Sequence, residues 1–279
     1  MEMNMDYKQI VVEREGNVVT CRVFNPPLQV FTTPMMAELN HLLSEIENDD
    51  SVRVFVVTGT DGVFIRWMDL TEMSDHSKAD LSEVTYVPTI GPIHELGMRI
   101  QKLKAVTVAA INGVVGGGGC EFSLSFDFRL MSADGPGYAE PVTFALPQTS
   151  FGLTPGGGGA WHCIRLLGRA KALDVLLHGE FMPPEQALEL GLISRLYPAE
   201  TYEQDVAAFV NNMAARAPLA LQGVKRLVSF GTDAGQLDFC AQEMKELMPT
   251  LTSKDAQLAL TSWLENPDPA AYNPQFTGE

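Results

Sequence analysis

The stretch Val106–Glu121, which reads VTVAAINGVVGGGGCE, decides the fold of this 279-residue chain. Its first six residues form a short apolar run rich in β-branched side chains, which is typical of a buried strand. Asn112-Gly113 marks a turn, and four glycines, Gly116–Gly119, then precede a helix that includes Phe122. The stretch therefore predicts a buried strand that leads through a glycine-rich turn into a helix.

The residues upstream extend this pattern. Short apolar or alternating runs predict further strands at 10–12, 18–23 and 53–58. A one-sided apolar periodicity predicts a helix from Pro34 to Ile46 with Thr33 as its N-cap. A polar loop from Gly62, which contains Pro88, and a helix near 93–103 lead to the strand at 106–111. Because strands alternate with helices, we expect an α/β fold with parallel strand pairing.

The predicted secondary structure of the downstream half becomes entirely helical towards the end of the chain. A second glycine cluster, Gly156–Gly159, opens a helix predicted at 160–167. From about Thr201 the apolar period is helical to the end, with helices predicted at 202–216, 218–230, 235–248 and 253–265. We therefore expect an α/β core at residues 1–200 and a helical region at residues 201–279.

The charge balance limits the classes of partner. The chain has 19 Lys and Arg against 35 Asp and Glu, a formal net charge of −16. This surplus opposes nucleic acid and anionic membrane surfaces, which attract Lys and Arg. The sequence contains no signal-peptide pattern and no apolar run long enough for a transmembrane helix. Its four cysteines lack metal-ligand spacing, so we expect a cytoplasmic protein without a bound metal.

Each glycine cluster places backbone N–H groups at the start of a helix, where an anion or a developing oxyanion binds well. The cluster Gly116–Gly119 lacks the Lys-Ser/Thr ending of a phosphate-binding P-loop. It also lies too late in the chain for a dinucleotide fingerprint, and no GxSxG nucleophile motif is present. The pattern leaves a site for an anion or for a developing oxyanion open, and a carboxylate, Glu121, follows the cluster directly.

At this point the sequence resembles a family. Ala109–Glu121 (AAINGVVGGGGCE) looks like the signature of the enoyl-CoA hydratase/isomerase (crotonase) superfamily. Similar segments follow in the family's order at 63–70, 144–148, 152–159, 166–172, 187–193 and 217–225. The resemblance implies a crotonase-type spiral of ββα units with a helical C-terminal trimerisation region. It also implies a homotrimer or a hexamer, acyl-CoA thioester substrates and no cofactor besides the coenzyme A of the substrate.

The resemblance implies a site as well. By position, an oxyanion hole falls on the backbone N–H groups of Met68 and Gly118. Hydratases of the family use two glutamates, of which the first matches Glu121 and the second falls on Gln148. Glutamine hydrogen-bonds but exchanges no proton at neutral pH. The expected substrate-binding residues are Phe64, Arg66, Trp67, Gly117 and His162.

We therefore expect an enzyme of the enoyl-CoA hydratase/isomerase type with Glu121 as its acid/base. Because Gln148 replaces the second glutamate, several alternatives stay open. They are an enolate-forming isomerase, a decarboxylase or thioester hydrolase of the same superfamily, a non-catalytic acyl-CoA-binding subunit, and an NAD-dependent oxidoreductase. Glu140 is an alternative acid or base near an insertion. A basic island for the phosphates of coenzyme A is expected from Arg66, Arg99, Lys102 and Lys104.

Overall fold

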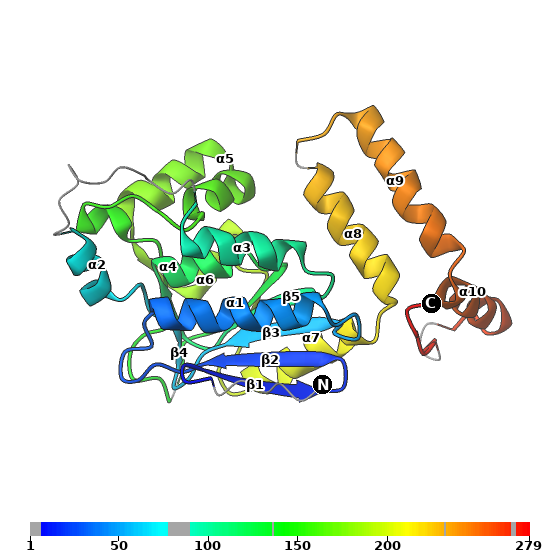
Figure 1. Ribbon diagram of the computed structural model, residues 1–279, viewed down its shortest axis with the longest axis horizontal. Coiled ribbons are helices and arrows are strands. Elements are labelled where there is room, and N and C mark those ends of the chain that lie inside the picture. Colours follow the sequence, from blue (N-terminus) through cyan, green and yellow to red (C-terminus); the bar gives the residue numbers. More distant parts are fainter. Residues whose placement is uncertain (1–6, 78–89, 136, 232, 269–271) are drawn as a thin grey trace.

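A six-stranded sheet in the order β1-β2-β3-β5-β7-β10 forms the centre of the computed structural model (Figure 1), which describes residues 7–77, 90–135, 137–231, 233–268 and 272–279. Its strands are β1 (Ile10–Glu15), β2 (Val18–Val23), β3 (Val54–Thr58), β5 (Val106–Ile111), β7 (Phe128–Ser132) and β10 (Arg195–Tyr197). β1 and β2 form an antiparallel hairpin, and every later neighbour is parallel. The predicted parallel α/β arrangement is confirmed.

A smaller sheet in the order β4-β6-β8-β9 stands beside the first. Its strands are β4 (Val63–Ile65), β6 (Val114–Gly116), β8 (Phe144–Ala145) and β9 (Phe181–Met182). The chain passes from β3 to β4, from β5 to β6 and from β7 to β8, and each pair is followed by a helix. This repeated strand–strand–helix order is the expected spiral of ββα units.

Helices cover both faces of the large sheet, which explains why β3 and β5 are apolar throughout. On one face, α1 (Thr33–Glu47) and α3 (Pro92–Lys102) contribute to the main hydrophobic core. On the other face, Val210 and Ala214 of α7 (Tyr202–Ala214) pack on residues of β3, β5 and β7. The first helix of the predicted C-terminal region is thus part of the sheet's packing.

Three local predictions need correction. The N-cap of α1 is Thr32, whose hydroxyl accepts from the Met35 N–H at 3.2 Å, whereas the Thr33 N–H donates to Glu72. The predicted polar loop contains β4 and α2 (Leu70–Ser77), which are too short to show a period; Pro88 lies outside the described residues. Helix α5 (Gly159–His178) continues past the predicted end, through a non-helical φ of 72° at Gly168.

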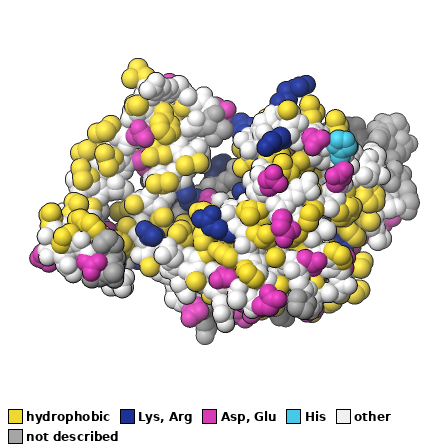
Figure 2. Space-filling model, turned by 180° about the vertical axis from the view of Figure 1, so that it is seen from behind, with side chains coloured by type: hydrophobic (Ala, Val, Ile, Leu, Met, Phe, Trp, Pro, Cys, Tyr) yellow, Lys and Arg dark blue, Asp and Glu magenta, His cyan; other side chains and the backbone are white. Residues whose placement is uncertain are grey.

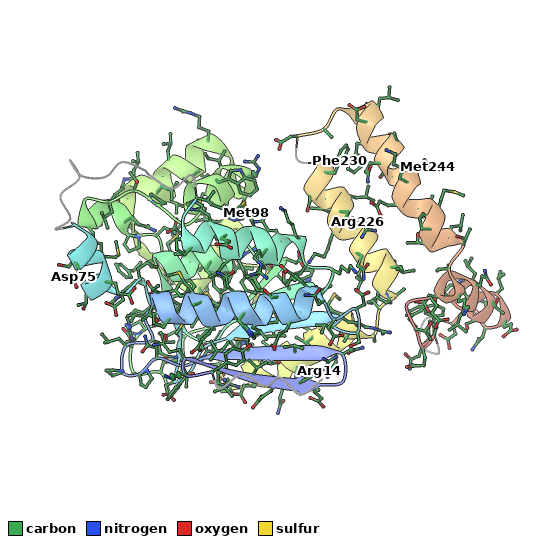
Figure 3. All side chains as sticks on the ribbon, in the orientation of Figure 1. Arg14, Asp75, Met98, Arg226, Phe230 and Met244 are labelled. Atoms are coloured by element: carbon green, nitrogen blue, oxygen red, sulfur yellow. The ribbon has the colours of Figure 1, made fainter. Side chains whose placement is uncertain are left out.

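The last three helices form the other end of the molecule (Figure 1), whereas the short helix α6 (Pro184–Leu190) belongs to the core. The last three are α8 (Pro218–Gly231), α9 (Gln236–Leu251) and α10 (Lys254–Glu265), close to their predicted ranges. Arg226 extends from α8 towards α9, where it binds Glu246 (Figure 3). The described part of the chain contains no helix long and apolar enough to cross a membrane.

One ion pair joins α8 to the large sheet. Lys225 Nζ lies 2.6 Å from Asp127 Oδ2 and donates to the Ala105 carbonyl, also at 2.6 Å. The same carboxylate oxygen accepts from the Thr107 N–H at 2.8 Å. Burial lowers the pKa of Lys225, and the neighbouring Asp127 opposes that shift. The pair fixes α8 at the start of β5.

We expect Asp127→Ala to lower the free energy of unfolding by about 2–4 kcal/mol, because it leaves the ammonium of Lys225 buried without a counter-charge. Urea unfolding followed by circular dichroism measures this change. Asp50→Ala is the matched control, since Asp50 and Lys104 form an exposed pair, and its effect should stay within ~0.5 kcal/mol. Equal effects of the two substitutions would contradict this account.

Candidate active site

An apolar cavity of about 570 Å³ lies where the two glycine clusters meet the helices α1, α2 and α3. Its walls come from Thr33, Met36, Trp67, Met68, Leu70, Glu72, Met73, Gly91, Pro92, Ile93, Gly117, Gly118, Glu121, Pro147, Gln148, Phe151, Leu153, Thr154 and Gly156. Six of the nine residues predicted for the site belong to this lining: Trp67, Met68, Gly117, Gly118, Glu121 and Gln148. The cavity is therefore the candidate active site.

Two backbone N–H groups are available at the cavity. Phe31 forms a parallel bridge with Met68, in which the Phe31 N–H donates to the Trp67 carbonyl at 2.7 Å and the Phe31 carbonyl accepts from the Asp69 N–H at 3.0 Å. The Met68 N–H therefore points to the opposite side of the chain. Gly118 is the first residue of α4 (Gly118–Ser123), so its N–H has no acceptor within the helix. Neither group has an acceptor among the described residues.

The side chain of Met68 packs closely against Gly118. A Cβ atom at Gly118 would lie 2.9 Å from Met68 Cγ and 3.1 Å from Ile93 Cδ1, so a larger residue there would require these side chains to shift. The loop before α2 and the start of α4 consequently share one wall of the cavity.

Glu121 is 3% exposed and is bound from three sides. Its Oε1 accepts from the N–H groups of Gly157 at 2.8 Å and Gly159 at 3.0 Å. Its Oε2 accepts from Gln148 Nε2 at 3.1 Å. The second glycine cluster was expected to bind an anion, and in the structure it binds this carboxylate of the protein itself.

The amide of Gln148 has one satisfied end and one unsatisfied end. A carboxylate only accepts hydrogen bonds, so Nε2 must face Glu121 and Oε1 must face away. Oε1 is shielded from solvent and has no hydrogen-bond partner among the described residues. Such an unpaired acceptor costs about 1–3 kcal/mol, which a donor from a bound ligand or water would remove.

Phe64, Arg66 and His162 are not among the cavity-lining residues. Phe64 is fully buried in the main core, because β4 directs it into the protein. Arg66 donates through both terminal nitrogens to Glu140 and lies 5.3 Å from the centroid of the Trp67 ring. Arg66 lowers the pKa of Glu140, and Glu140 likewise lies outside the cavity lining.

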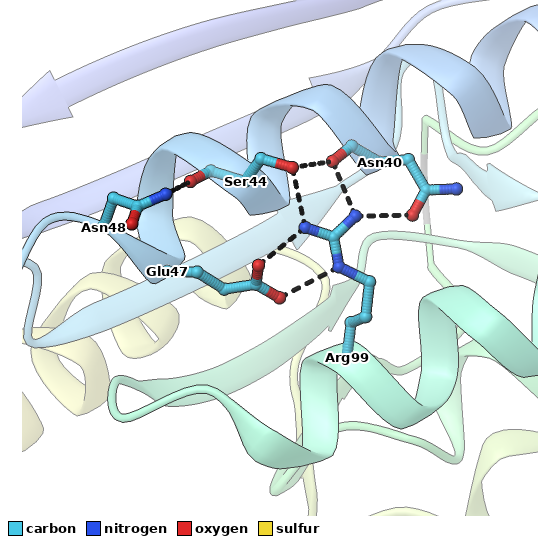
Figure 4. Close-up of polar contacts among 5 residues, drawn as sticks. All are labelled: Asn40, Ser44, Glu47, Asn48 and Arg99. Atoms are coloured by element: carbon cyan, nitrogen blue, oxygen red, sulfur yellow. Dashed lines mark hydrogen bonds and ion pairs between the residues drawn. The ribbon is translucent and has the colours of Figure 1, made fainter.

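The expected basic island is not confirmed, because three of its four cations, Arg66, Arg99 and Lys104, bind separate carboxylates. Arg99 on α3 binds Glu47, Asn40 and Ser44 of α1 (Figure 4), whereas Lys104 binds Asp50. These ion pairs join neighbouring helices and loops. The sequence alone does not indicate which carboxylates bind these cations, because Glu47 lies 52 residues from Arg99 and Asp50 lies 54 residues from Lys104.

His162 is a buried, neutral histidine. Its Nε2 lies 3.3 Å from both Ser125 Oγ and Gln101 Nε2, within hydrogen-bond distance of each. Burial lowers the pKa of His162 to about 4, and the charges of Arg129 and Arg165 add to this shift. The side chain supports the packing of α5 behind the site.

This shift predicts a pH dependence of stability. The unfolded chain protonates His162 below its usual pKa of 6.5, whereas the folded chain does so only near 4. The free energy of unfolding therefore falls as the pH falls between these values, by about 2 kcal/mol at pH 5 from this residue. Urea titrations at pH 7 and pH 5 should show a smaller fall for His162→Gln than for the wild type. The same fall in both proteins would refute the assignment.

The comparisons with known proteins agree with the fold. The sequence profile described as Enoyl-CoA hydratase/isomerase matches residues 13–274. The short-chain-enoyl-CoA hydratase of Clostridium acetobutylicum is 24% identical over 94% of this chain and 96% of its own length. The 2,3-dehydroadipyl-CoA hydratase of Escherichia coli is 26% identical over 94% of this chain and 97% of its own length.

Solved structures show the same fold. The enoyl-CoA hydratase of Bacillus anthracis superposes with a TM-score of 0.85 at 24% identity, over 98% of this chain and 100% of that one. An enoyl-CoA hydratase subunit from Geobacillus kaustophilus superposes with a TM-score of 0.84 at 25% identity, over 99% and 100%. Since the family profile covers nearly the whole sequence, this chain belongs to the enoyl-CoA hydratase/isomerase family.

Proposed function

We propose that this protein acts on acyl-CoA thioesters by stabilising a thioester enolate, with the N–H groups of Met68 and Gly118 as the oxyanion hole and Glu121 as the acid/base. The supporting observation is that two backbone N–H groups without an acceptor and one firmly bound carboxylate line the same apolar cavity. Coenzyme A is part of the substrate, and the proposed mechanism requires no further cofactor.

The oxyanion hole carries the electrostatic part of the mechanism. Removal of a proton beside the thioester carbonyl, or attack of water on the conjugated double bond, places negative charge on the thioester oxygen. Two preorganised N–H donors stabilise that charge, and each such donor is typically worth about 10²–10³ in rate. The apolar walls exclude water and so strengthen this interaction.

Glu121 carries the proton in this mechanism. Gly157 and Gly159 both bind Oε1, so Oε2 is the oxygen that exchanges protons. In hydration, Oε2 takes one proton from water while the water oxygen bonds to the β-carbon. The same proton then passes from Oε2 to the α-carbon, which completes the addition of water with a single carboxyl group. In this step the Gln148 amide would turn, so that its Oε1, which has no partner among the described residues, accepts the second proton of that water in a hydrogen bond.

Gln148 favours isomerisation as a second candidate. Moving a double bond from the 3,4 to the 2,3 position removes a proton from the α-carbon and returns a proton to carbon 4. One carboxyl group performs both transfers and no water is consumed. The family's second glutamate is expected at the position of Gln148. Because isomerisation needs only one proton-carrying group, the amide at this position does not impair the reaction.

We also infer a homotrimer, or a hexamer made from two trimers. Large apolar side chains are exposed on the C-terminal helices: Val224, Val228, Leu237, Met244, Leu251 and Leu264. Figure 2 shows hydrophobic side chains over this end of the molecule. Burial of such a surface against other copies would stabilise the helices α8–α10. The cytoplasmic location stays a prediction.

Glu121→Gln tests the mechanism. We expect turnover of crotonyl-CoA, followed through the absorbance of the conjugated thioester, and of a 3-enoyl thioester to fall about 10²–10⁴-fold, because the amide cannot carry a proton. The affinity for the saturated butyryl-CoA should change less than ~3-fold. Glu13→Gln, an exposed site on β1, is the charge-matched control. Turnover that survives Glu121→Gln would refute the mechanism, and binding without any turnover in the wild type would favour a non-catalytic subunit.

Gln148→Leu separates the two reactions. Leucine offers no acceptor to the attacking water, so hydration should fall at least ~10-fold. Isomerisation needs Glu121 alone and should change less than ~5-fold. The ratio of the two kcat/KM values, measured on the same preparation, therefore shifts towards isomerisation. Hydration at the wild-type rate in this variant would exclude a water-binding role for Gln148.

A further inference from the structure

The cavity lining contains a second carboxylate besides Glu121, that of Glu72. Glu72 lies on α2, beside the N-terminal end of α1 (Figure 1). Its Oε2 accepts from the Thr33 hydroxyl at 2.8 Å and from the Thr33 N–H at 3.1 Å. These contacts fix the carboxylate in place at the edge of the cavity.

Among the described residues, the charge of Glu72 has no cationic partner. Thr33 is a neutral donor, and the first turn of α1 supplies only a partial positive charge. Among the described residues that line the cavity, none is Lys or Arg, and the only charged side chains are Glu72 and Glu121. The lining residues that lie close to Glu72 and Thr33 in the sequence are apolar; they are Met36, Leu70 and Met73.

Such a cavity discriminates between acyl groups by charge. A neutral chain buries apolar surface against the methionines and leaves Glu72 with its Thr33 contacts. A chain that ends in a carboxylate brings a further negative charge into an apolar space that already contains two. Glu72 is half-buried at the edge of the cavity. Placing like charges next to one another there disfavours the wrong ligand.

We propose that Glu72 is a specificity-determining residue that excludes acyl groups with a terminal carboxylate, so that the substrates are thioesters of neutral, mainly apolar acyl chains. This inference rests on the proposed function, since it assumes that the cavity receives the acyl group. It adds the class of acyl chain and a residue that selects it.

Calorimetric titration with hexanoyl-CoA and adipyl-CoA tests the proposal. The two thioesters share the coenzyme and the six-carbon chain, so their ratio of Kd values isolates the terminal carboxylate. We expect the wild type to bind adipyl-CoA at least ~10-fold more weakly than hexanoyl-CoA. Glu72→Gln preserves an acceptor for Thr33 and should narrow this ratio at least ~3-fold, mainly through tighter binding of adipyl-CoA. Glu72→Lys should narrow it further.

The controls separate the possible failures. Glu13→Gln removes one surface charge on β1 and should leave the ratio within ~1.5-fold of the wild type. In the wild type, raising the salt concentration should also narrow the ratio, which requires no variant to fold. Equal affinities for the two thioesters in the wild type, or a ratio that Glu72→Gln leaves unchanged, would overturn this inference alone. Failure to bind either thioester would overturn the proposed function and this inference with it.

Discussion

The contact between the carboxylate of Glu121 and the N–H groups of Gly157 and Gly159 is the interaction on which the site depends. It joins the starts of two helices, α4 and α5, across 36 and 38 residues of sequence. A Cβ atom at Gly159 would lie 2.8 Å from Glu121 Cγ, so glycine is required for the approach. Because Oε1 is occupied in this way, Oε2 determines the orientation of Gln148. The position of one carboxylate thus sets the polar wall of the cavity.

The rest of the cavity follows from the repeated strand–strand–helix units. The first unit places the loop that contains Met68 against Phe31, and the Met68 N–H has no acceptor among the described residues. The second unit places Gly118 at the start of α4, where the Met68 side chain packs closely against it. In the proposed mechanism the two donors therefore come from separate units, and their geometry depends on the packing of whole layers of the fold. Backbone groups fixed in this way need no reorganisation when charge develops on a ligand.

Local features of the structure could be predicted from the sequence, whereas features that depend on partners far away in the sequence could not. The strands β3 and β5 are continuous apolar runs, and α1 has a clear one-sided period, so their existence could be predicted from spacing alone. The strands β8 and β9 contain two residues each, which is too few for any period. Arg66 illustrates the second limit: its partner Glu140 is 74 residues away, and pairing with it turns a predicted ligand-binding cation into part of a salt bridge. Glu72 has no motif at all; only the folded structure shows that it shares a cavity with Glu121.

The positions of the charged residues therefore matter more for function than the net charge of −16. Arg66, Arg99 and Lys104 each bind a carboxylate of the protein, so these cations are largely neutralised before any ligand arrives. The described walls of the cavity contain carboxylates as their only charged groups, and the remaining lining is mostly apolar. Under the proposed function, the affinity for the acyl part of a thioester comes from burial of apolar surface and from two backbone donors. The proposed role of Glu72 then makes a negative charge on that part of the ligand unfavourable, so acidic residues would oppose nucleic acid at the surface and charged acyl groups inside the cavity.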